Sequence, residues 1–277
     1  MNLWYALWDT LSVQWLSMNF MKNALLAVLV MSPLFGLLST MVVTGKLSFF
    51  SDALGHSGFT GIAIGVLCGA AFPTGWAVGL AVAFALLFSF VRSRTSQATE
   101  TIISVFSSTA VALGIFIATM NGSSFTKFNQ YLIGDILSVT PSEIGLLFFV
   151  LMLVLVLWLL ASNRLLLTTI HPQLASSRGI PVRGFETLFT VSIAVVVTLS
   201  MSWVGLMVVN SLLVLPAAAA RNIAKNLRQY HLFSVVFTLT AGVAGLATSY
   251  YLGTSTGAVI SLYLAVIFVL TFCLRKK

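Results

Sequence analysis

The sequence predicts an all-α, polytopic integral membrane protein with a single transmembrane domain over residues 1–277. Of its 277 residues, 59% are hydrophobic and only 7% are charged, whereas a soluble domain carries about 25% charged residues. Several apolar runs reach the roughly 17–25 residues that cross a bilayer as a helix. Because no polar stretch of comparable length separates these runs, we expect no additional soluble domain.

The apolar runs and the turn residues between them predict about nine membrane-spanning helices, with eight as the alternative. In chain order they cover about 23–43, 51–72, 76–91, 101–120, 144–160, 185–199, 204–220, 232–251 and 257–274. Pro33 is expected to kink the first span, and Pro73 and Gly75 to form the turn before the third. Residues 1–19 place leucines and tryptophans at helical spacing, which indicates a short helix in the membrane interface or an extension of the first span.

The net charge of +8 arises from basic clusters that lie between apolar runs. These clusters are Arg92 and Arg94; Arg164, Arg178 and Arg183; Arg221, Lys225 and Arg228; and Arg275, Lys276 and Lys277. Such spacing follows the positive-inside rule, so we expect these loops and the C-terminus to face the cytoplasm, with the chain in the cell membrane. The basic residues are not interleaved with aromatic ones, which argues against nucleic acid as a partner.

Two segments between the spans carry signals for helix ends. Before the fifth span, Thr140, Pro141 and Glu143 match an N-cap, a first helical residue and a capping-box acid. Asp135 is expected to cap a short helix just before them, or to line an outer vestibule that attracts cations. In the basic segment 161–184, Pro172 is expected to open a short helix that Gly179 ends. This short helix is either a plain connector or a surface presented to another protein.

The strongest functional candidates are Asp52 and His56, which lie four residues apart in an otherwise uncharged hydrophobic stretch. Residues at i and i+4 share one face of a helix, and Thr60 continues the same face by one turn. Ionisable side chains at membrane depth are costly and therefore mark functional sites. A carboxylate and an imidazole suit a first-row divalent metal ion. A hydrogen bond that braces the fold and a proton relay through the histidine are the alternatives.

Next to this polar face, small residues recur every four positions, at Ser57, Gly61, Gly65 and Gly69. A ridge of small residues lets another helix approach closely. Two ligands are too few for a closed structural metal site, but they suit a transport pathway in which an ion binds and then leaves. A second pair could come from a symmetric dimer.

Signals for catalysis are absent from the sequence. It contains no G-x-x-x-x-G-K-[ST] phosphate-binding loop, no H-E-x-x-H motif and no G-x-S-x-G nucleophile elbow. The remaining histidines, His171 and His231, lie beside a proline and a basic cluster and are weak candidates for a metal role. We therefore expect a protein that is not an enzyme.

Four stretches of the chain, in order, resemble the metal-ion permease family of bacterial ABC importers, which take up zinc, manganese or iron. They are SDALGHS at 51–57 with GIAIG at 61–65, YLIGDILSVTP at 131–141, VGLMVVNSLLVLPAAAAR at 204–221, and YYLGTSTG at 250–257. The resemblance spans most of the chain, which makes it more specific than any one motif.

This resemblance implies a permease of the ABC importer type that forms a homodimer and moves metal between two halves. It implies a cytoplasmic ATP-binding subunit, an extracytoplasmic metal-binding protein, and no permanently bound cofactor besides the transported Zn²⁺ or Mn²⁺/Fe²⁺. Asp52 and His56 match residues on the family's metal path, with Thr60 and Asp135 as further lining. The matching coupling helix, which contacts the ATPase, comprises His171, Pro172, Gln173, Leu174, Ala175, Arg178, Gly179 and Ile180.

Two departures from the family pattern bear on function. His171 and Gln173 stand where acidic residues are common in the family. Ser107 and Ser108 match neither the zinc nor the manganese and iron relatives, and zinc is the slightly favoured ion. The alternatives to an ABC permease are a secondary transporter that couples metal to protons through Asp52 and His56, and a membrane anchor that scaffolds an enzyme.

Overall fold

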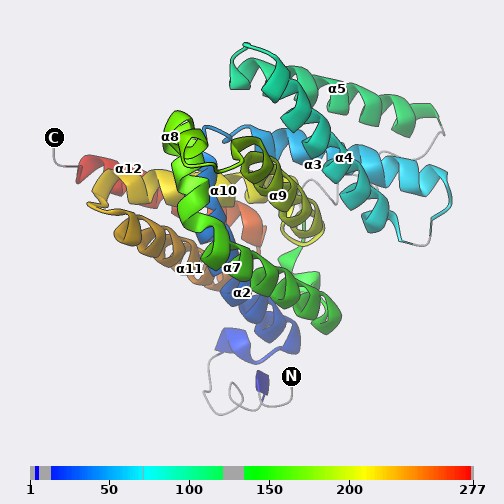
Figure 1. Cartoon of the computed structure of the whole chain (residues 1–277). Coiled ribbons are helices and arrows are strands. Elements are labelled where there is room, and N and C mark those ends of the chain that lie inside the picture. Colours follow the sequence, from blue (N-terminus) through cyan, green and yellow to red (C-terminus); the bar gives the residue numbers. More distant parts are fainter. Residues whose placement is uncertain (1–3, 6–13, 71, 121–133, 276–277) are drawn as a thin grey trace. The chain divides into compact units, whose positions relative to one another are not determined.

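A computed structural model describes residues 4–5, 14–70, 72–120 and 134–275, and within them it contains helices and no strand (Figure 1). The elements are η1 (Gln14–Leu16), α2 (Asn19–Thr44), α3 (Phe50–Leu67), α4 (Pro73–Arg94), α5 (Thr99–Met120), η2 (Ile136–Ser138), α7 (Pro141–Ile170), α8 (Pro172–Ser177), α9 (Val182–Val204), α10 (Leu206–Ile223), α11 (Leu227–Leu252) and α12 (Thr256–Cys273). The all-α prediction is confirmed. Most of the predicted interfacial helix over 1–19 lies outside the described residues.

Eight of the described helices are long and apolar enough to cross a membrane, namely α2, α4, α5, α7, α9, α10, α11 and α12. This number agrees with the lower of the two predicted counts. Helix α3 covers most of the predicted span 51–72 but is not among the eight. Asp52, His56 and four glycines lower its hydropathy.

The fifth predicted span, 144–160, is shorter than the helix that forms there. Helix α7 runs from Pro141 to Ile170, because its final turns still bury an apolar face, with Leu165 and Leu166 both less than a tenth exposed. The start of the helix matches the prediction. The Glu143 carboxylate accepts hydrogen bonds from the backbone N–H of Thr140 at 2.8 Å and from its hydroxyl at 2.7 Å.

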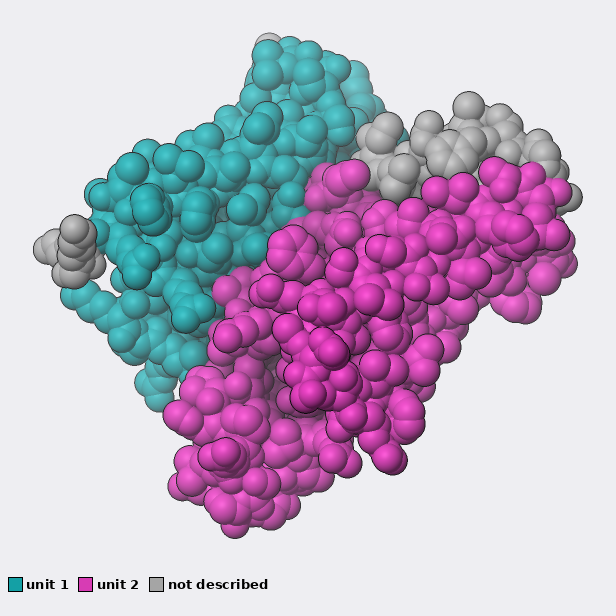
Figure 2. All heavy atoms as spheres, turned by 90° about the horizontal axis from the view of Figure 1, so that it is seen from above, with its two compact units in different colours: residues 1–40, 134–156, 211–277 teal, residues 41–133, 157–210 magenta. Residues whose placement is uncertain are grey.

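The chain forms two compact units, coloured separately in Figure 2. Unit 1 comprises 1–40, 134–156 and 211–277, and unit 2 comprises 41–133 and 157–210. The expectation of a single domain stays a prediction.

In unit 1, α11 packs against α12 and approaches α2 at two polar pairs. A Cβ atom on Gly245 would lie 2.5 Å from Ile260 of α12, so the absence of a side chain permits this approach. Between α2 and α11, the hydroxyls of Ser39 and Ser234 are 2.8 Å apart. Nδ1 of His231 lies 2.9 Å from the Thr40 hydroxyl, which places this histidine in helix packing.

In unit 2, α3 is enclosed by α4, α5 and α9. Aromatic rings join three of these helices near the start of α3. The rings of Phe50 and Phe88 have centroids 4.4 Å apart, and Phe88 meets Phe106 edge to face at 5.8 Å. All but five of the 18 residues of α3 are buried, so packing against protein holds this helix in place.

Helices α9 and α10 are separated by one residue, Gly205. Its φ of 87° is a conformation that side chains rarely adopt. The sequence indicated a boundary near this point but did not show that it is a single-residue break. Because α10 restarts at Leu206, the break sets which of its side chains face α3.

Candidate functional site

Asp52 and His56 lie in the first two turns of α3 and face one another. Nε2 of His56 is 3.5 Å from Oδ2 of Asp52, and the two side chains are 27% and 43% exposed, respectively. This separation is longer than an ordinary hydrogen bond of about 2.7–3.2 Å. A tetrahedral metal ion with ligand bonds of about 2.1 Å would hold two ligand atoms about 3.4 Å apart. The expected shared face is therefore present, with a spacing that suits a common cation.

A third polar group reaches this pair from α10. Nδ2 of Asn210 donates a hydrogen bond of 2.8 Å to Oδ1 of Asp52, whereas Oδ2 faces His56. Asn210 lies within the stretch 204–221 that resembles the permease family, and the resemblance assigned it no role. A lone amide in the apolar run 204–220 was the available signal, since polar groups are costly at membrane depth.

The contact that aligns Asn210 with Asp52 lies one turn away. The Leu206 side chain packs so closely on Gly55 that a Cβ there would lie 2.9 Å from Leu206 Cγ. Leu206 precedes Asn210 by four residues, and Gly55 follows Asp52 by three, so each pair shares a helical face. From one contact to the other, the residue number rises along α3 and falls along α10. Helices α3 and α10 therefore cross in an antiparallel register at the site.

The Asp52 carboxylate also opens onto a polar hollow of about 340 Å³. Its opposite wall is a stripe of α5 with helical spacing, formed by Glu100, Ser104, Ser107 and Ser108. Glu100 was not predicted to belong to this stripe, although polar residues recur every three or four positions in the sequence of α5. The hollow therefore combines two carboxylates with three hydroxyls.

Thr60 lies on the predicted face but is committed to helix packing. Its hydroxyl contacts the carbonyl of Ala110 in α5 at 2.8 Å and that of His56 at 3.0 Å, and the residue is only 2% exposed. The hydroxyl thus ties α3 to α5. A role in lining a pathway stays a prediction for Thr60.

The predicted ridge of small residues is present over two turns. A Cβ on Gly61 would lie 2.6 Å from Ala77 Cα in α4, and one on Gly65 would lie 3.2 Å from Pro73 Cα. Ser57 is buried, and its hydroxyl donates to Leu54 O at 2.8 Å. Gly69 departs from the prediction, because α3 ends at Leu67 and Gly69 has φ +66° with nothing within 4 Å. Gly69 therefore lets the chain turn away after the end of α3 and does not pack against a neighbouring helix.

The ridge has a counterpart on another face of α3, which sequence analysis missed. A Cβ on Gly58 would lie 3.0 Å from Met201 Sδ in α9. Together with Gly55, this glycine brings α3 against the segment that leads into α10. The repeat every three residues (55, 58, 61) was the available signal.

Asp135 belongs to unit 1, whereas Asp52 and His56 belong to unit 2. Its carboxylate accepts a hydrogen bond of 3.0 Å from the backbone N–H of Leu137 and caps η2. The capping prediction is confirmed. The alternative, a share in an outer cation vestibule, stays a prediction.

The predicted short helix in the basic segment is α8. Pro172 is its first residue, His171 is its N-cap, and Gly179 follows its end with φ +72°. Gly179 N–H bonds to Ser176 O and Ile180 N–H bonds to Ala175 O, which is the Schellman pattern of a helix C-terminus. Six of the eight predicted coupling residues are exposed, namely His171, Pro172, Gln173, Leu174, Arg178 and Gly179.

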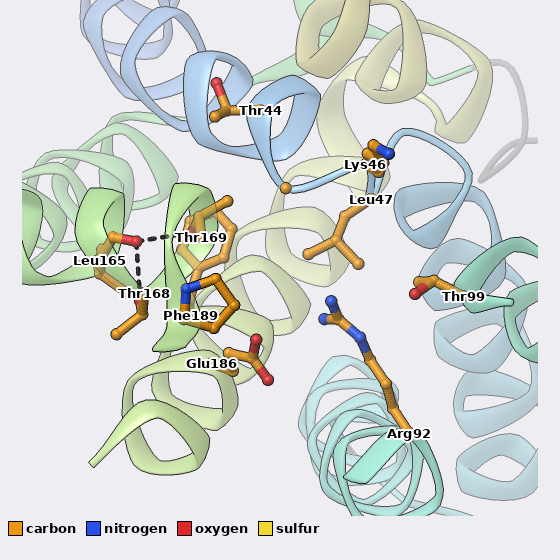
Figure 3. Close-up of a pocket in the computed structure, with 12 residues that line it drawn as sticks. Thr44, Lys46, Leu47, Arg92, Thr99, Leu165, Thr168, Thr169, Glu186 and Phe189 are labelled. Atoms are coloured by element: carbon orange, nitrogen blue, oxygen red, sulfur yellow. Dashed lines mark hydrogen bonds between the residues drawn. The ribbon is translucent and has the colours of Figure 1, made fainter. Parts of the chain in front are cut away.

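Beside α8 lies a hollow of about 250 Å³ that includes Pro172 in its wall. Arg92 extends into it, and the Glu186 carboxylate lies on the opposite side (Figure 3). Lys46 also belongs to its lining. This charged hollow adjoins the exposed surface of α8.

Among the described residues, no group of three or more His, Cys, Asp or Glu side chains is placed to hold a metal ion. Asp52 and His56 form a pair of such side chains, and neither His171 nor His231 belongs to a larger group with them. The arrangement offers a partly exposed carboxylate, an imidazole and a neighbouring amide, a set suited to reversible contact with a cation.

Comparison finds known proteins that are similar to this chain over most of its length. The model of the ABC 3 transport family matches residues 17–275. The chain is 26% identical over 254 residues to the "High-affinity zinc uptake system membrane protein ZnuB" of Haemophilus influenzae, covering 92% of this chain and 97% of that protein. It is 28% identical over 259 residues to the "Manganese import system permease protein ScaB" of Streptococcus gordonii, covering 94% and 92%.

A solved structure agrees with the fold. "PsaBC from Streptococcus pneumoniae in complex with Fab" matches with a TM-score of 0.80 and 27% identity, covering 92% of each chain.

Proposed function

The chain belongs to the ABC 3 transport family, and we propose that it is the permease subunit of an importer that takes up a divalent transition metal ion. Relatives named for zinc uptake and for manganese import support metal as the cargo. In this proposal a separate cytoplasmic ATP-binding subunit supplies the energy, and an extracytoplasmic metal-binding protein delivers the ion.

The observation that carries the proposal is the spacing of Asp52 and His56. Their facing atoms are 3.5 Å apart, close to the separation of two ligands on one tetrahedral ion. Both side chains are partly exposed, and Asp52 opens onto the polar hollow. A site with two ligands from these residue types binds an ion without enclosing it, so the ion can leave again.

Transport then requires a conformational equilibrium of the permease that both ion binding and the ATPase shift. The exposed residues of α8 form the surface that we assign to ATPase docking, as a coupling helix. A second copy of the chain is proposed to complete the pathway as a homodimer and to supply a second Asp52 and His56. The positive-inside rule, applied to the basic loops, supports a cytoplasmic position for α8 and the C-terminus in this proposal.

Zinc is the proposed preferred ion, because imidazole is a ligand that suits zinc, whereas manganese prefers oxygen ligands. The relatives include both zinc and manganese systems, and a carboxylate accepts either metal. Selectivity is therefore a separate measurement from transport.

The decisive experiment is uptake of radiolabelled zinc and manganese by liposomes that contain the chain with a co-expressed ATP-binding subunit. We expect ATP-dependent uptake that Asp52→Asn and His56→Ala both abolish, while each variant still co-purifies with the ATPase. Normal uptake by both variants would remove the metal site from the pathway.

The same liposomes separate the proposal from its alternatives. Uptake by the chain alone, driven by a pH gradient without nucleotide, would identify a proton-coupled transporter instead. A cellular phenotype that neither Asp52→Asn nor His56→Ala changes would identify a membrane anchor that scaffolds an enzyme.

A further inference from the structure

The amide of Asn210 is bonded at one end only. Its Nδ2 donates to Asp52 Oδ1 at 2.8 Å. Its Oδ1 is buried and has no hydrogen-bond partner among the described residues. A buried acceptor without a partner is unfavourable, so this oxygen calls for an explanation, and the proposed function does not supply one.

The backbone holds this amide at the cation site. Leu206 packs against Gly55 with almost no exposed surface, and this contact fixes the register of α10 on α3. Asn210 lies one turn further along the same face of α10. The register of the two helices therefore keeps Asn210 beside Asp52, and rotation about its Cβ–Cγ bond exchanges the positions of its two polar atoms without a shift of the helix.

We propose that Asn210 is a third ligand of the cation that Asp52 and His56 bind, an inference that rests on the proposed function. In the structure, the Asn210 N–H group bonds to the Asp52 carboxylate. When a cation enters, the amide turns over, and Oδ1 takes the position of Nδ2. Two features favour this exchange: no hydrogen bond holds the oxygen in its present position, and the cation replaces the single bond that is broken.

The distances suit this exchange. The atoms of Asn210 and Asp52 that face each other are 2.8 Å apart. Adjacent oxygen ligands of a six-coordinate ion with bonds of about 2.1 Å are about 3.0 Å apart. An oxygen in the place of Nδ2 would thus share an ion with Asp52 after small adjustments. Without a cation between them, the two oxygens would repel each other, so the turned amide is specific to the occupied site.

The third ligand has a consequence for selectivity. Amide and carboxylate oxygens suit manganese, which accepts six oxygen-rich ligands, whereas imidazole suits zinc. The Asn210 oxygen should therefore contribute more to the binding of Mn²⁺ than to the binding of Zn²⁺. The site then accepts both ions, and Asn210 sets the ratio of their affinities.

The test is equilibrium dialysis of the full chain in lipid nanodiscs against radiolabelled Mn²⁺ or Zn²⁺, each alone. Asn210→Leu, which keeps the size and removes both polar groups, should weaken Mn²⁺ binding by about tenfold or more and Zn²⁺ binding by a clearly smaller factor. Asn210→Asp, which offers oxygen but no N–H donor, should keep Mn²⁺ binding within about threefold of the unaltered chain.

Asn210→Asp separates a ligand from a residue that merely positions Asp52. If Asn210 acts only through its N–H group, Asn210→Asp loses Mn²⁺ binding as fully as Asn210→Leu, and the inference is overturned. Equal affinities of Asn210→Leu and the unaltered chain for both ions would overturn it as well.

A matched control lies on the same helix. Asn222 is about three turns further along α10 and donates to the Thr271 hydroxyl in unit 1. Asn222→Leu should leave the ratio of the Mn²⁺ and Zn²⁺ affinities unchanged, and an equal change in that ratio would count against a local role for Asn210.

Asp52→Asn distinguishes a failure of the Asn210 ligand from a failure of the proposed function. Loss of both ions in Asp52→Asn, together with unchanged binding in Asn210→Leu, would sink the inference and leave the proposed function standing. Binding of both ions that is indifferent to Asp52→Asn would overturn the proposed function and the inference together.

Discussion

Gly55→Ala is expected to destabilise the chain, because the new methyl group would collide with Leu206. The Cβ atom would lie 2.9 Å from Leu206 Cγ and 3.0 Å from its Cδ2, and it would overlap its Cδ1. Leu206 is only 1% exposed, so it has no empty space into which to turn. Overpacking of this kind costs about 1–3 kcal/mol. For a chain of this size, the cost corresponds to a fall in Tm of about 2–12 °C.

A compensating substitution makes the prediction specific to this contact. Leu206→Ala alone removes a buried side chain at a cost of about 2–5 kcal/mol. In the double variant, the Gly55→Ala methyl group enters the space that Leu206→Ala vacates. The double variant should therefore lose less than the sum of the two single losses, by about the 1–3 kcal/mol of the relieved overlap.

The measurement is the Tm of the detergent-solubilised chain, followed as the fraction that remains monodisperse in size-exclusion chromatography after heating. Losses that add to within about 0.5 kcal/mol would show that the two residues do not meet, and the register of α3 on α10 would then be wrong. Gly79→Ala is the matched control. Gly79 lies inside α4 with nothing within 4 Å of an added Cβ, so its replacement should not lower Tm.

Three further changes test other contacts. Thr60→Val removes the hydroxyl that contacts Ala110 O and should lower Tm by about 2–4 °C, equivalent to about 1 kcal/mol; an unchanged Tm would mean that this bond adds nothing. Gly179→Ala forces a side chain into a φ of +72°, at a cost of about 1–2 kcal/mol. It should reduce the yield of co-purified ATP-binding subunit, and an equal yield would argue against α8 as the docking surface. Asn226→Ala removes the cap that accepts the Gln229 N–H at 2.8 Å and should cost about 1 kcal/mol, measured as a lower Tm, whereas no loss would indicate that water replaces the cap.

The parts of the fold that sequence analysis located depend on short-range signals. Thr140 and Glu143 are three residues apart, and the capping bonds between them follow from that spacing. Pro172 and Gly179 likewise mark the ends of α8 through their own backbone preferences. The end of α7 was misplaced, because the polar residues after 160 suggested a loop, whereas the apolar face that the helix still buries extends it to Ile170.

The site shows where such signals end. The pairing of Asp52 with His56 follows from helical spacing alone. The pairing of Asp52 with Asn210 joins residues 158 positions apart, and it depends on the break at Gly205 and on the contact of Leu206 with Gly55. No periodicity within either segment encodes the register between them. The polar stripe of α5, headed by Glu100, was missed for the same reason, since its partner lies on another helix.

Packing against neighbouring helices allows α3 to contain polar side chains that would be unfavourable in contact with lipid. An aspartate and a histidine at membrane depth are costly when they face lipid. The glycines of α3 lower its hydropathy further, yet they admit α4 on one face and the Leu206 segment on another at distances that a methyl group would obstruct. This close enclosure buries most of α3 and leaves Asp52 and His56 partly exposed beside a polar hollow. The glycines that weaken α3 as an independent membrane span are therefore the ones that let the surrounding helices shelter its polar face.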